Sequence, residues 1–266
     1  MEEKRHERLA KRLAGRRGNS LRPLAPNLVP GVNLTGLGDF ISGNDNGDDS
    51  NTKQTVYSSN WAGAVIISSG ITEVTGTFTV PSVSEPAGGS DSTEYGASAW
   101  VGIDGDTCGA AILQTGVECL VEGTETAYSA WYEWYPDYSY TFTDFDVAPG
   151  NVIRATVQAT STTSGVATLE NQSTGQSVSH TFSDESSTGT LCETNAEWIV
   201  EDFQIGSSLV PFANFGSVTF TGASYQSNGA SHGVTGATIF DVQQNGQTQT
   251  DCGTSGDSEV YCNYEG

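Results

Sequence analysis

Two glutamates on one short apolar run are the residues best suited to chemistry in this sequence. Residues 196–203 read Ala-Glu-Trp-Ile-Val-Glu-Asp-Phe. Strand alternation places Glu197 and Glu201 on one face, beside large apolar side chains. A carboxylate on a buried face is costly, whereas a half-buried groove shifts its pKa and suits it for acid–base catalysis. Both glutamates are therefore catalytic candidates. Any glutamate on a surface strand would show the same pattern, so the pattern alone does not choose between them.

Two further segments carry polar groups in apolar surroundings. Gln114 lies in the run Ala-Ile-Leu-Gln-Thr-Gly (111–116), where its amide either satisfies a backbone carbonyl or faces a substrate carbonyl. Glu133 lies in the run Ala-Trp-Tyr-Glu-Trp-Tyr-Pro (130–136), whose rings fit either a core or an aromatic-lined cleft. A carbohydrate-binding sandwich, or a glycoside hydrolase with two of these three glutamates as its carboxylate pair, is therefore an alternative.

Other catalytic chemistries lack their residues. The body has two histidines, His180 and His232, with no His-Glu-x-x-His run or Cys/His cluster, so we expect no metal and no cofactor. A Walker loop, a Rossmann fingerprint and the Asp-Thr-Gly or Asp-Ser-Gly pair of pepsin-like proteases are all absent. Residues 229–233 match Gly-x-Ser-x-Gly, but we predict a loop there, because no helix follows to expose the serine.

The elements that must position these residues read as short strands. From about residue 55, β-branched and aromatic runs alternate with Gly, Ser, Asn and Asp. Fourteen runs are predicted strands: 62–67, 71–80, 97–103, 111–115, 127–135, 138–146, 151–160, 165–171, 176–182, 196–203, 215–221, 235–243, 247–251 and 258–263. With no helical periodicity and no fixed repeat, they predict an all-β sandwich or barrel.

Charge divides the chain into two parts. The net charge is −22, yet eight of the ten basic residues lie in the first 22 positions, and residues 53–266 hold 25 acidic and two basic residues. So acidic a body excludes nucleic acid and an anionic membrane surface as partners, and no run of ~18 apolar residues could span a membrane. Its self-repulsion weakens as carboxylates protonate, which favours a protein that works in acid.

The amino-terminal part reads differently from the body. Residues 1–17 are predicted helical, and residues 18–52, with early prolines and a Gly/Asn/Asp run, read as a linker. We expect a domain boundary near 52, with residues 1–52 either a disordered tail or a removable basic pro-segment, followed by one domain over 53–266. No apolar core of a secretory signal is visible in this sequence.

Five cysteines, none in a Cys-x-x-Cys motif, point away from a zinc ribbon. Cys252 and Cys262 flank a Gly/Ser turn and could face each other across a hairpin. Disulfides would place the body in an oxidising compartment.

A set of motifs, in order and with matching spacing from about Val56 onward, resembles the fungal glutamic peptidases, also called eqolisins. They are SNWAG (59–63), WVGIDGDTC (100–108), AILQTG (111–116), AWYEWYP (130–136), ATLEN (167–171), CETNAEWIVEDF (192–203) and VPFANF (210–215). The resemblance implies a lectin-like (concanavalin-like) antiparallel β-sandwich of two seven-stranded sheets. It also implies a secreted, pepstatin-insensitive acid endopeptidase acting on proteins or peptides, monomeric, with its own pro-segment as inhibitor.

Residue roles follow from the same resemblance, position by position. Gln114 and Glu201, rather than Glu197, match the catalytic pair. The implied cleft and disulfide positions are Trp61, Trp100, Asp104 and Glu133, and the pairs Cys108–Cys192 and Cys252–Cys262, which leave Cys119 unpaired. Ser129 and Gln204 depart from acidic residues found in one member of the family, so no role is carried over to them.

The implied mechanism has a physical rationale at acidic pH. Glu201, with an ordinary pKa near ~4.3, would take a proton from the attacking water and return it to the leaving amine. Gln114 cannot ionise, so its NH2 group can donate to the oxyanion at any pH.

Overall fold

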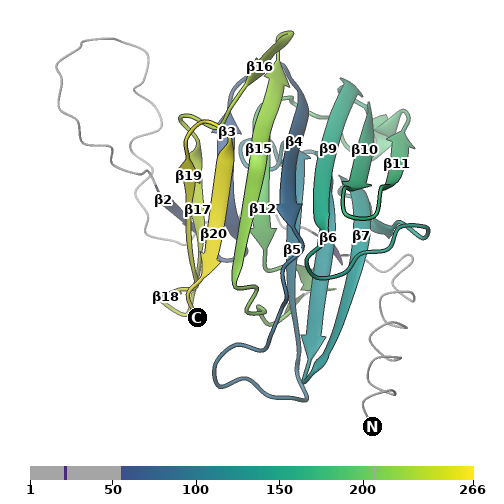
Figure 1. Cartoon of the computed structure of the whole chain (residues 1–266). Helices are drawn as coiled ribbons and strands as arrows, with labels where there is room; N and C mark the ends of the chain where they lie inside the picture. The colour runs from purple at the N-terminus through teal and green to yellow at the C-terminus, as the bar shows by residue number, and fades with distance from the viewer. Residues whose placement is uncertain (1–20, 23–54, 206–207) are drawn as a thin grey trace, which may run out of the picture.

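The computed structural model describes residues 21–22, 55–205 and 208–266. Their regular structure consists of strands and one short 3-10 helix, η1 (Glu185–Ser187). Two sheets lie face to face and form a sandwich (Figure 1). The expected all-β sandwich of antiparallel sheets is confirmed.

One layer is a nine-stranded sheet that contains every candidate catalytic residue. In spatial order its strands are β18 (Gln247–Thr248), β17 (Thr238–Gln244), β3 (Trp61–Ile67), β12 (Asn195–Glu201), β5 (Glu94–Ile103), β6 (Ile112–Glu122), β7 (Glu125–Tyr135) and β8 (Tyr140–Thr141), with β2 (Thr55–Ser58) paired to β17. The β2–β17 pair is parallel, and the other pairs of this sheet are antiparallel.

The other layer is an eight-stranded sheet. Its strands are β11 (Gln176–Phe182), β10 (Ser164–Asn171), β9 (Val152–Ser161), β4 (Ile71–Thr79), β15 (Ser217–Ser227), β20 (Glu259–Tyr264) and β19 (Thr250–Ser255), with β16 (Ala230–His232) paired to β15. A small third sheet joins β1 (Leu21–Arg22), β13 (Gln204–Ile205) and β14 (Ser208–Leu209). Each large sheet has seven strands of four or more residues, and shorter strands at the edges account for the difference from the expected seven.

Most predicted strands are present, and the differences have local causes. The strand expected over 138–146 reduces to Tyr140–Thr141. The Phe142 N–H still donates to the Ala130 carbonyl of β7 at 2.9 Å, and beyond it the buried Phe142 and Phe145 side chains hold the stretch by apolar contacts. The loop expected over 229–233 contains strand β16, which pairs with β15 through Ser231 and its neighbours. No helix follows that serine, so the nucleophile-elbow setting is absent.

The main core lies between the two sheets. The inward residues of β12 (Ala196, Trp198 and Val200) belong to it, and the Trp198 indole N–H donates to the Thr75 carbonyl of the facing sheet at 2.8 Å. Among the described residues, no helix is long or apolar enough to cross a membrane. The predicted helix over 1–17 and most of the predicted linker lie outside the described residues.

Candidate active site

Strand β12 lies between β3 and β5 in the nine-stranded sheet and presents two glutamates on its outer face. Because side chains alternate along a strand, Glu197, Ile199 and Glu201 face away from the sandwich core that takes up their neighbours. The outer face of this sheet has a second apolar cluster of its own, which includes Trp61, Trp100 and Ile199. The sequence pattern predicted this shared face correctly.

Strand register aligns the candidate residues in three rows on that outer face. The first row is Val65, Glu197, Gly102, Gln114 and Glu133; the second is Gly63, Ile199, Trp100, Gly116 and Trp131; the third is Trp61, Glu201, Ser98, Glu118 and Ser129. The implied pair, Glu201 and Gln114, therefore lies on a diagonal with Trp100 at its centre. Glycines flank Trp100 because its indole packs over Gly102 and its Cβ over Gly116, where an added Cβ would collide.

Glu201 is 1% exposed, and each of its carboxyl oxygens accepts a hydrogen bond. The indole N–H of Trp100 donates to Oε2 at 2.9 Å, and the amide of Asn60 donates to Oε1 at 3.4 Å. The Trp61 ring packs edge-on to Trp100 at 5.0 Å. Glu201 is thus a carboxyl group fixed by N–H donors in apolar surroundings.

Burial raises the pKa of Glu201 to about 8, against the opposing effect of the donors Trp100 and Asn60. The indole N–H of Trp61 acts in the same direction as these donors, although it makes no hydrogen bond of ordinary geometry. The negative charge of Asp202 raises the pKa further. The expectation of an ordinary pKa near ~4.3 is therefore wrong, since removal from water outweighs the three N–H groups that lower the pKa.

Gln114 is completely buried in β6, and neither end of its amide has a hydrogen-bond partner in the described structure. A buried amide without a partner costs on the order of 1–3 kcal/mol, so proteins keep such a group where a ligand or water completes it. Glu133 and Gly102 are its cross-strand neighbours. The unpartnered amide favours the reading in which Gln114 faces a substrate over the one in which it satisfies a backbone carbonyl.

Glu197 has a different environment at the other end of β12. It is completely buried, and Oε1 accepts a hydrogen bond from the backbone N–H of Asp106 at 3.2 Å, whereas Oε2 has no partner. Burial, followed by the charges of Asp106 and Asp104, raises its pKa well above the ordinary value. Burial also raises the pKa of Asp106 to about 6.

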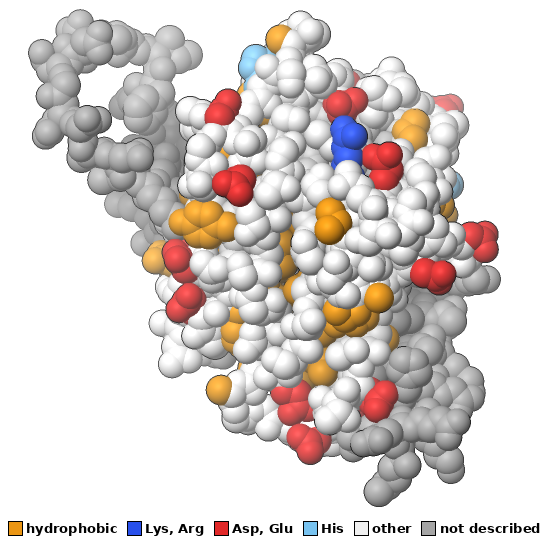
Figure 2. Space-filling view, in the orientation of Figure 1, with side chains coloured by type: hydrophobic (Ala, Val, Ile, Leu, Met, Phe, Trp, Pro, Cys, Tyr) orange, Lys and Arg blue, Asp and Glu red, His pale blue; other side chains and the backbone are white. Residues whose placement is uncertain are grey.

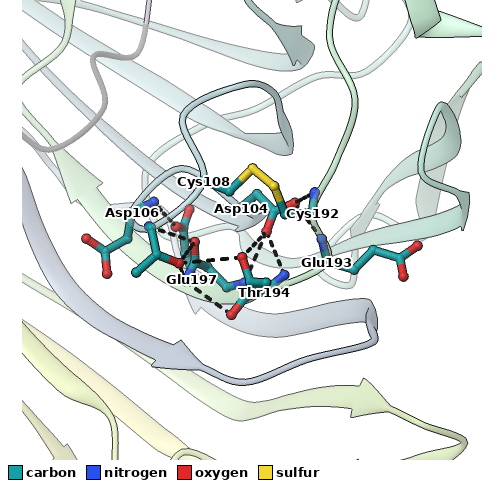
Figure 3. Close-up of a disulfide and its surroundings, with 9 residues drawn as sticks. Asp104, Asp106, Cys108, Cys192, Glu193, Thr194 and Glu197 are labelled. Atoms are coloured by element: carbon teal, nitrogen blue, oxygen red, sulfur yellow. Dashed lines mark hydrogen bonds between the residues drawn. A yellow bond between two sulfur atoms is a disulfide. The ribbon is translucent and has the colours of Figure 1, made fainter. Parts of the chain in front are cut away.

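Asp104 anchors the segment 192–195 beside the disulfide (Figure 3). Its carboxylate accepts hydrogen bonds from four backbone N–H groups, of residues 192 to 195, and from the Thr194 hydroxyl, at 2.7–3.1 Å. Its φ of 67° is in the left-handed region, which aspartate tolerates better than most residues. With its oxygens occupied in this way, Asp104 has the geometry of a structural carboxylate rather than a substrate ligand.

The implied disulfides are both present. Cys108 pairs with Cys192 and Cys252 pairs with Cys262, while Cys119 is a buried free thiol. The first disulfide ties the loop after β5 to the segment before β12, and so supports the strand that presents both glutamates. Across the described ranges, no group of three or more His, Cys, Asp or Glu side chains is placed to hold a metal ion.

Sequence reasoning missed three residues that contact or flank Glu201. Asn60 donates to its carboxyl group, Ser58 donates to Asn60 Oδ1 at 3.1 Å, and Asp202 accepts a 2.6 Å hydrogen bond from Gln244. The short motif at 59–63 was the signal for Asn60, although its small polar residues resemble any turn, and Ser58 lies just before that motif. Burial raises the pKa of Asp202 to about 8.

The surface of the eight-stranded sheet carries many acidic and few basic side chains (Figure 2). Arg154 is the only Lys or Arg in residues 55–266, and it pairs with Glu170 at 3.7 Å. Both side chains are about half exposed, so this ion pair adds little stability.

Comparisons with known proteins agree with this geometry. The model of the Peptidase A4 family matches residues 59–264. The chain is 51% identical to aspergillopepsin-2 of Aspergillus niger, over 96% of this chain and 90% of the relative, and 48% identical to scytalidopepsin B of Scytalidium lignicola, over 80% and 81%.

A crystal structure of scytalido-glutamic peptidase with a transition state analog inhibitor matches with a TM-score of 0.71 at 47% identity, covering 78% of this chain and 98% of that one. A structure of aspergilloglutamic peptidase from Aspergillus niger matches with a TM-score of 0.62 at 57% identity, covering 64% and 99%. The chain therefore belongs to the peptidase A4 family and is a glutamic peptidase, a hydrolase of peptide bonds.

Proposed function

We propose that this peptidase is an acid endopeptidase in which Glu201 and Gln114 are the catalytic pair. The observation that carries the proposal is the outer face of the nine-stranded sheet. That face holds a carboxyl group fixed by two N–H donors and, diagonally across Trp100, a buried amide with no partner. A peptide bound over Trp100 would lie between the two groups.

Glu201 serves as base and then as acid. Its ionised carboxyl group takes a proton from the water that attacks the scissile carbonyl, and the protonated group then gives a proton to the leaving amine. With its pKa raised to about 8, mainly by burial, Glu201 holds a proton throughout the acidic range in the resting chain. Water bound beside the carboxyl group solvates its ionised form and so lowers the pKa, which makes the base available together with the attacking water.

Gln114 stabilises the oxyanion that forms on the former carbonyl oxygen. Its NH2 group is buried and has no competing acceptor, so its donors are available to the substrate. An amide does not titrate, which keeps the donor present in acid, where a histidine base would be protonated. Removing one donor of this kind costs about 10²–10³ in kcat.

Four residues are proposed to line the substrate cleft: Trp61, Trp100, Asp104 and Glu133. The two tryptophans and Glu133 lie on the outer face with the catalytic pair. Asp104 has its oxygens occupied by residues 192–195, so its contribution is to shape the rim rather than to bind substrate directly.

Residues 1–52 are proposed to act as a pro-segment that inhibits a monomeric body spanning residues 53–266. Eight of the ten basic residues lie in the first 22, and residues 53–266 carry a net charge of −23. The electrostatic attraction between this basic segment and the acidic body weakens when carboxylates protonate and when salt screens the charges. If deleting residues 1–52 leaves activity at pH 6 unchanged, and 1 M salt does not change the latency of the full chain, this role is refuted.

Secretion fits the two disulfides, which persist in oxidising compartments. Insensitivity to pepstatin fits the absence of the paired Asp-Thr-Gly or Asp-Ser-Gly motifs.

One assay tests the activity: the full chain is incubated at pH 3–4 with a denatured protein and pepstatin. New internal cleavages that persist with pepstatin support the proposal, and complete inhibition by pepstatin refutes the assigned pair.

A further inference from the structure

Two completely buried polar residues lie beside Glu201: Asn60, in the turn between β2 and β3, contacts its carboxyl group, and Ser58, at the end of β2, contacts Asn60. Asn60 directly precedes β3, the neighbour of the strand that presents the carboxyl group. The proposed reaction assigns Ser58 and Asn60 no role. Burying such groups is costly unless their hydrogen bonds are met, so the pattern of those bonds is informative.

The Ser58 hydroxyl fixes the orientation of the Asn60 amide. Its oxygen accepts hydrogen bonds from the backbone N–H groups of Asn60 at 3.2 Å and of Trp61 at 3.1 Å. A hydroxyl has one proton and two acceptor positions, so its proton goes to Asn60 Oδ1 at 3.1 Å. That leaves the Nδ2 end of the amide to face Glu201 Oε1, as a donor and not as an acceptor.

The backbone of the turn is tied to the residues that follow Glu201. The Asp202 backbone N–H donates to the Asn60 carbonyl at 2.8 Å. Gln244 donates to the Ser59 carbonyl at 2.9 Å and to the Asp202 carboxyl group at 2.6 Å. The distance between the amide and Glu201 is therefore set by the backbone and does not depend on a flexible side chain alone.

We propose that Asn60 is a positioning residue that holds the Glu201 carboxyl group through Oε1, and that Ser58 keeps the donor end of its amide turned toward Glu201. This inference rests on the proposed role of Glu201 and adds two residues to it. Trp100 from β5 holds the other oxygen, so the two donors together fix the plane of the carboxyl group. A carboxyl group fixed in this way is oriented for proton transfer before substrate arrives.

The charge environment makes the amide important for protonation as well. Among the described residues, the groups that bear on Glu201 are the N–H donors Trp100, Asn60 and Trp61 and the carboxyl groups Asp202 and Glu197. No cation is among them, so donors alone oppose the effect of burial. Loss of Asn60 as a donor is expected to raise the pKa of Glu201 above its value of about 8.

The first test compares Asn60→Leu with Asn171→Leu, which removes an equally buried asparagine that caps a turn in the other sheet. Asn60→Leu is expected to lower kcat about tenfold, leave KM within about twofold, and move the acidic limb of the kcat profile to higher pH. Asn171→Leu is expected to lower stability but leave the pH profile unchanged. The same pH profile in wild type and Asn60→Leu would overturn the proposal.

The second test uses milder variants and does not depend on activity. Ser58→Ala frees the amide to rotate, and Ser227→Ala removes a buried hydroxyl far from Glu201, bonded to the Ser69 carbonyl. In carbon-13 NMR of glutamate-labelled full chain, the Glu201 signal is identified by its loss in Glu201→Gln. Ser58→Ala and Asn60→Leu should move its titration to higher pH, Asn60→Gln should restore part of it, and Ser227→Ala should not change it.

These readouts separate the inference from the function on which it rests. An unchanged Glu201 titration in both Asn60→Leu and Ser58→Ala overturns the positioning role, whatever the activity. Full activity in Glu201→Gln overturns the proposed function instead, even if the titration depends on Asn60.

Discussion

The two ends of the outer face of β12 present the same residue type in contrasting surroundings. Glu201 and Glu197 lie on one face of one strand, four residues apart, and both are buried. At Glu201 each oxygen accepts an N–H, whereas at Glu197 one oxygen accepts a backbone N–H and the other has none. Glu197 also lies near Asp104 and Asp106, which add negative charge.

In the proposed function, that difference separates the carboxyl group that reacts from a neutral one that does not. Donors favour the ionised form and neighbouring carboxylates oppose it, so burial raises the pKa of Glu201 to about 8 and raises that of Glu197 well above its ordinary value with less opposition. Glu201, with a donor on each oxygen, is the group of the two that hydration can more readily bring to ionisation. Glu201 and Glu197 are thus equally buried on one face of β12, yet their hydrogen bonds and nearby charges differ and set their protonation differently.

The largest expected effect is the loss of activity in Glu201→Gln. The substitution keeps the shape of the side chain but removes the group that moves protons, so kcat/KM for a peptide substrate should fall by about 10²–10⁴. The melting temperature should fall modestly, since the new NH2 group faces one of the two N–H donors that the carboxyl oxygens accepted. An active, folded Glu201→Gln variant would contradict the assignment of the reaction to Glu201 rather than to Glu197.

Replacing Gln114, which lies in the same row of the sheet as Glu197, tests whether Glu201 needs a second group for the reaction. Gln114→Ala should lower kcat by about 10²–10³, with a smaller change in KM, because the donor acts mainly on the oxyanion. Gln158→Ala, on the opposite sheet and exposed, is the control and should behave as wild type. A Gln114→Ala variant that loses only affinity for substrate would show that the amide binds the ground state and not the oxyanion.

Asp104 tests the structural character of the Glu197 end. Asp104→Ala leaves four buried or half-buried backbone N–H groups without their acceptor, so the free energy of unfolding should fall by about 3–5 kcal/mol. Urea unfolding measures it, with the exposed Asp144→Ala as control. Loss of activity without loss of stability would place Asp104 among the groups that bind substrate.

The smallest expected effect is on the pH dependence of stability. The folded pKa values of Asp106 (about 6), Glu201 (about 8) and Glu197 are raised above those of the unfolded chain. The folded state binds these protons more tightly, so their stabilisation is complete below pH ~4 and is lost as pH rises through the folded values. The melting temperature should therefore be highest in acid and fall toward pH 8.

Glu197→Gln isolates one contribution to that slope. It should leave the melting temperature unchanged near pH 3 and raise it by about 2–4 °C at pH 7, because the buried amide never has to ionise. Glu170→Gln, an exposed glutamate on β10, is the control. A destabilised Glu197→Gln at pH 7 would mean that Glu197 is ionised in the folded protein.

The sequence was sufficient for the sandwich and for the shared face of Glu197 and Glu201, because strand alternation depends only on local spacing. It was insufficient for the choice between the two glutamates, which depends on donors from other strands: Asn60 is 141 residues from Glu201 along the chain. The resemblance supplied that choice, and it also implied Asp104 as a cleft residue without showing its bonds to residues 192–195. Family membership decides against the carbohydrate alternative.

The most direct test of the central claim is the ratio of kcat/KM between Glu197→Gln and Glu201→Gln. Both full-length variants are assayed at pH 3.5 on one denatured protein substrate, with pepstatin present. The proposed function gives the proton transfers to Glu201 and none to Glu197, so the ratio should exceed about 10². A ratio near one, with both variants folded, would contradict the assignment of the chemistry to the Glu201 end of the strand.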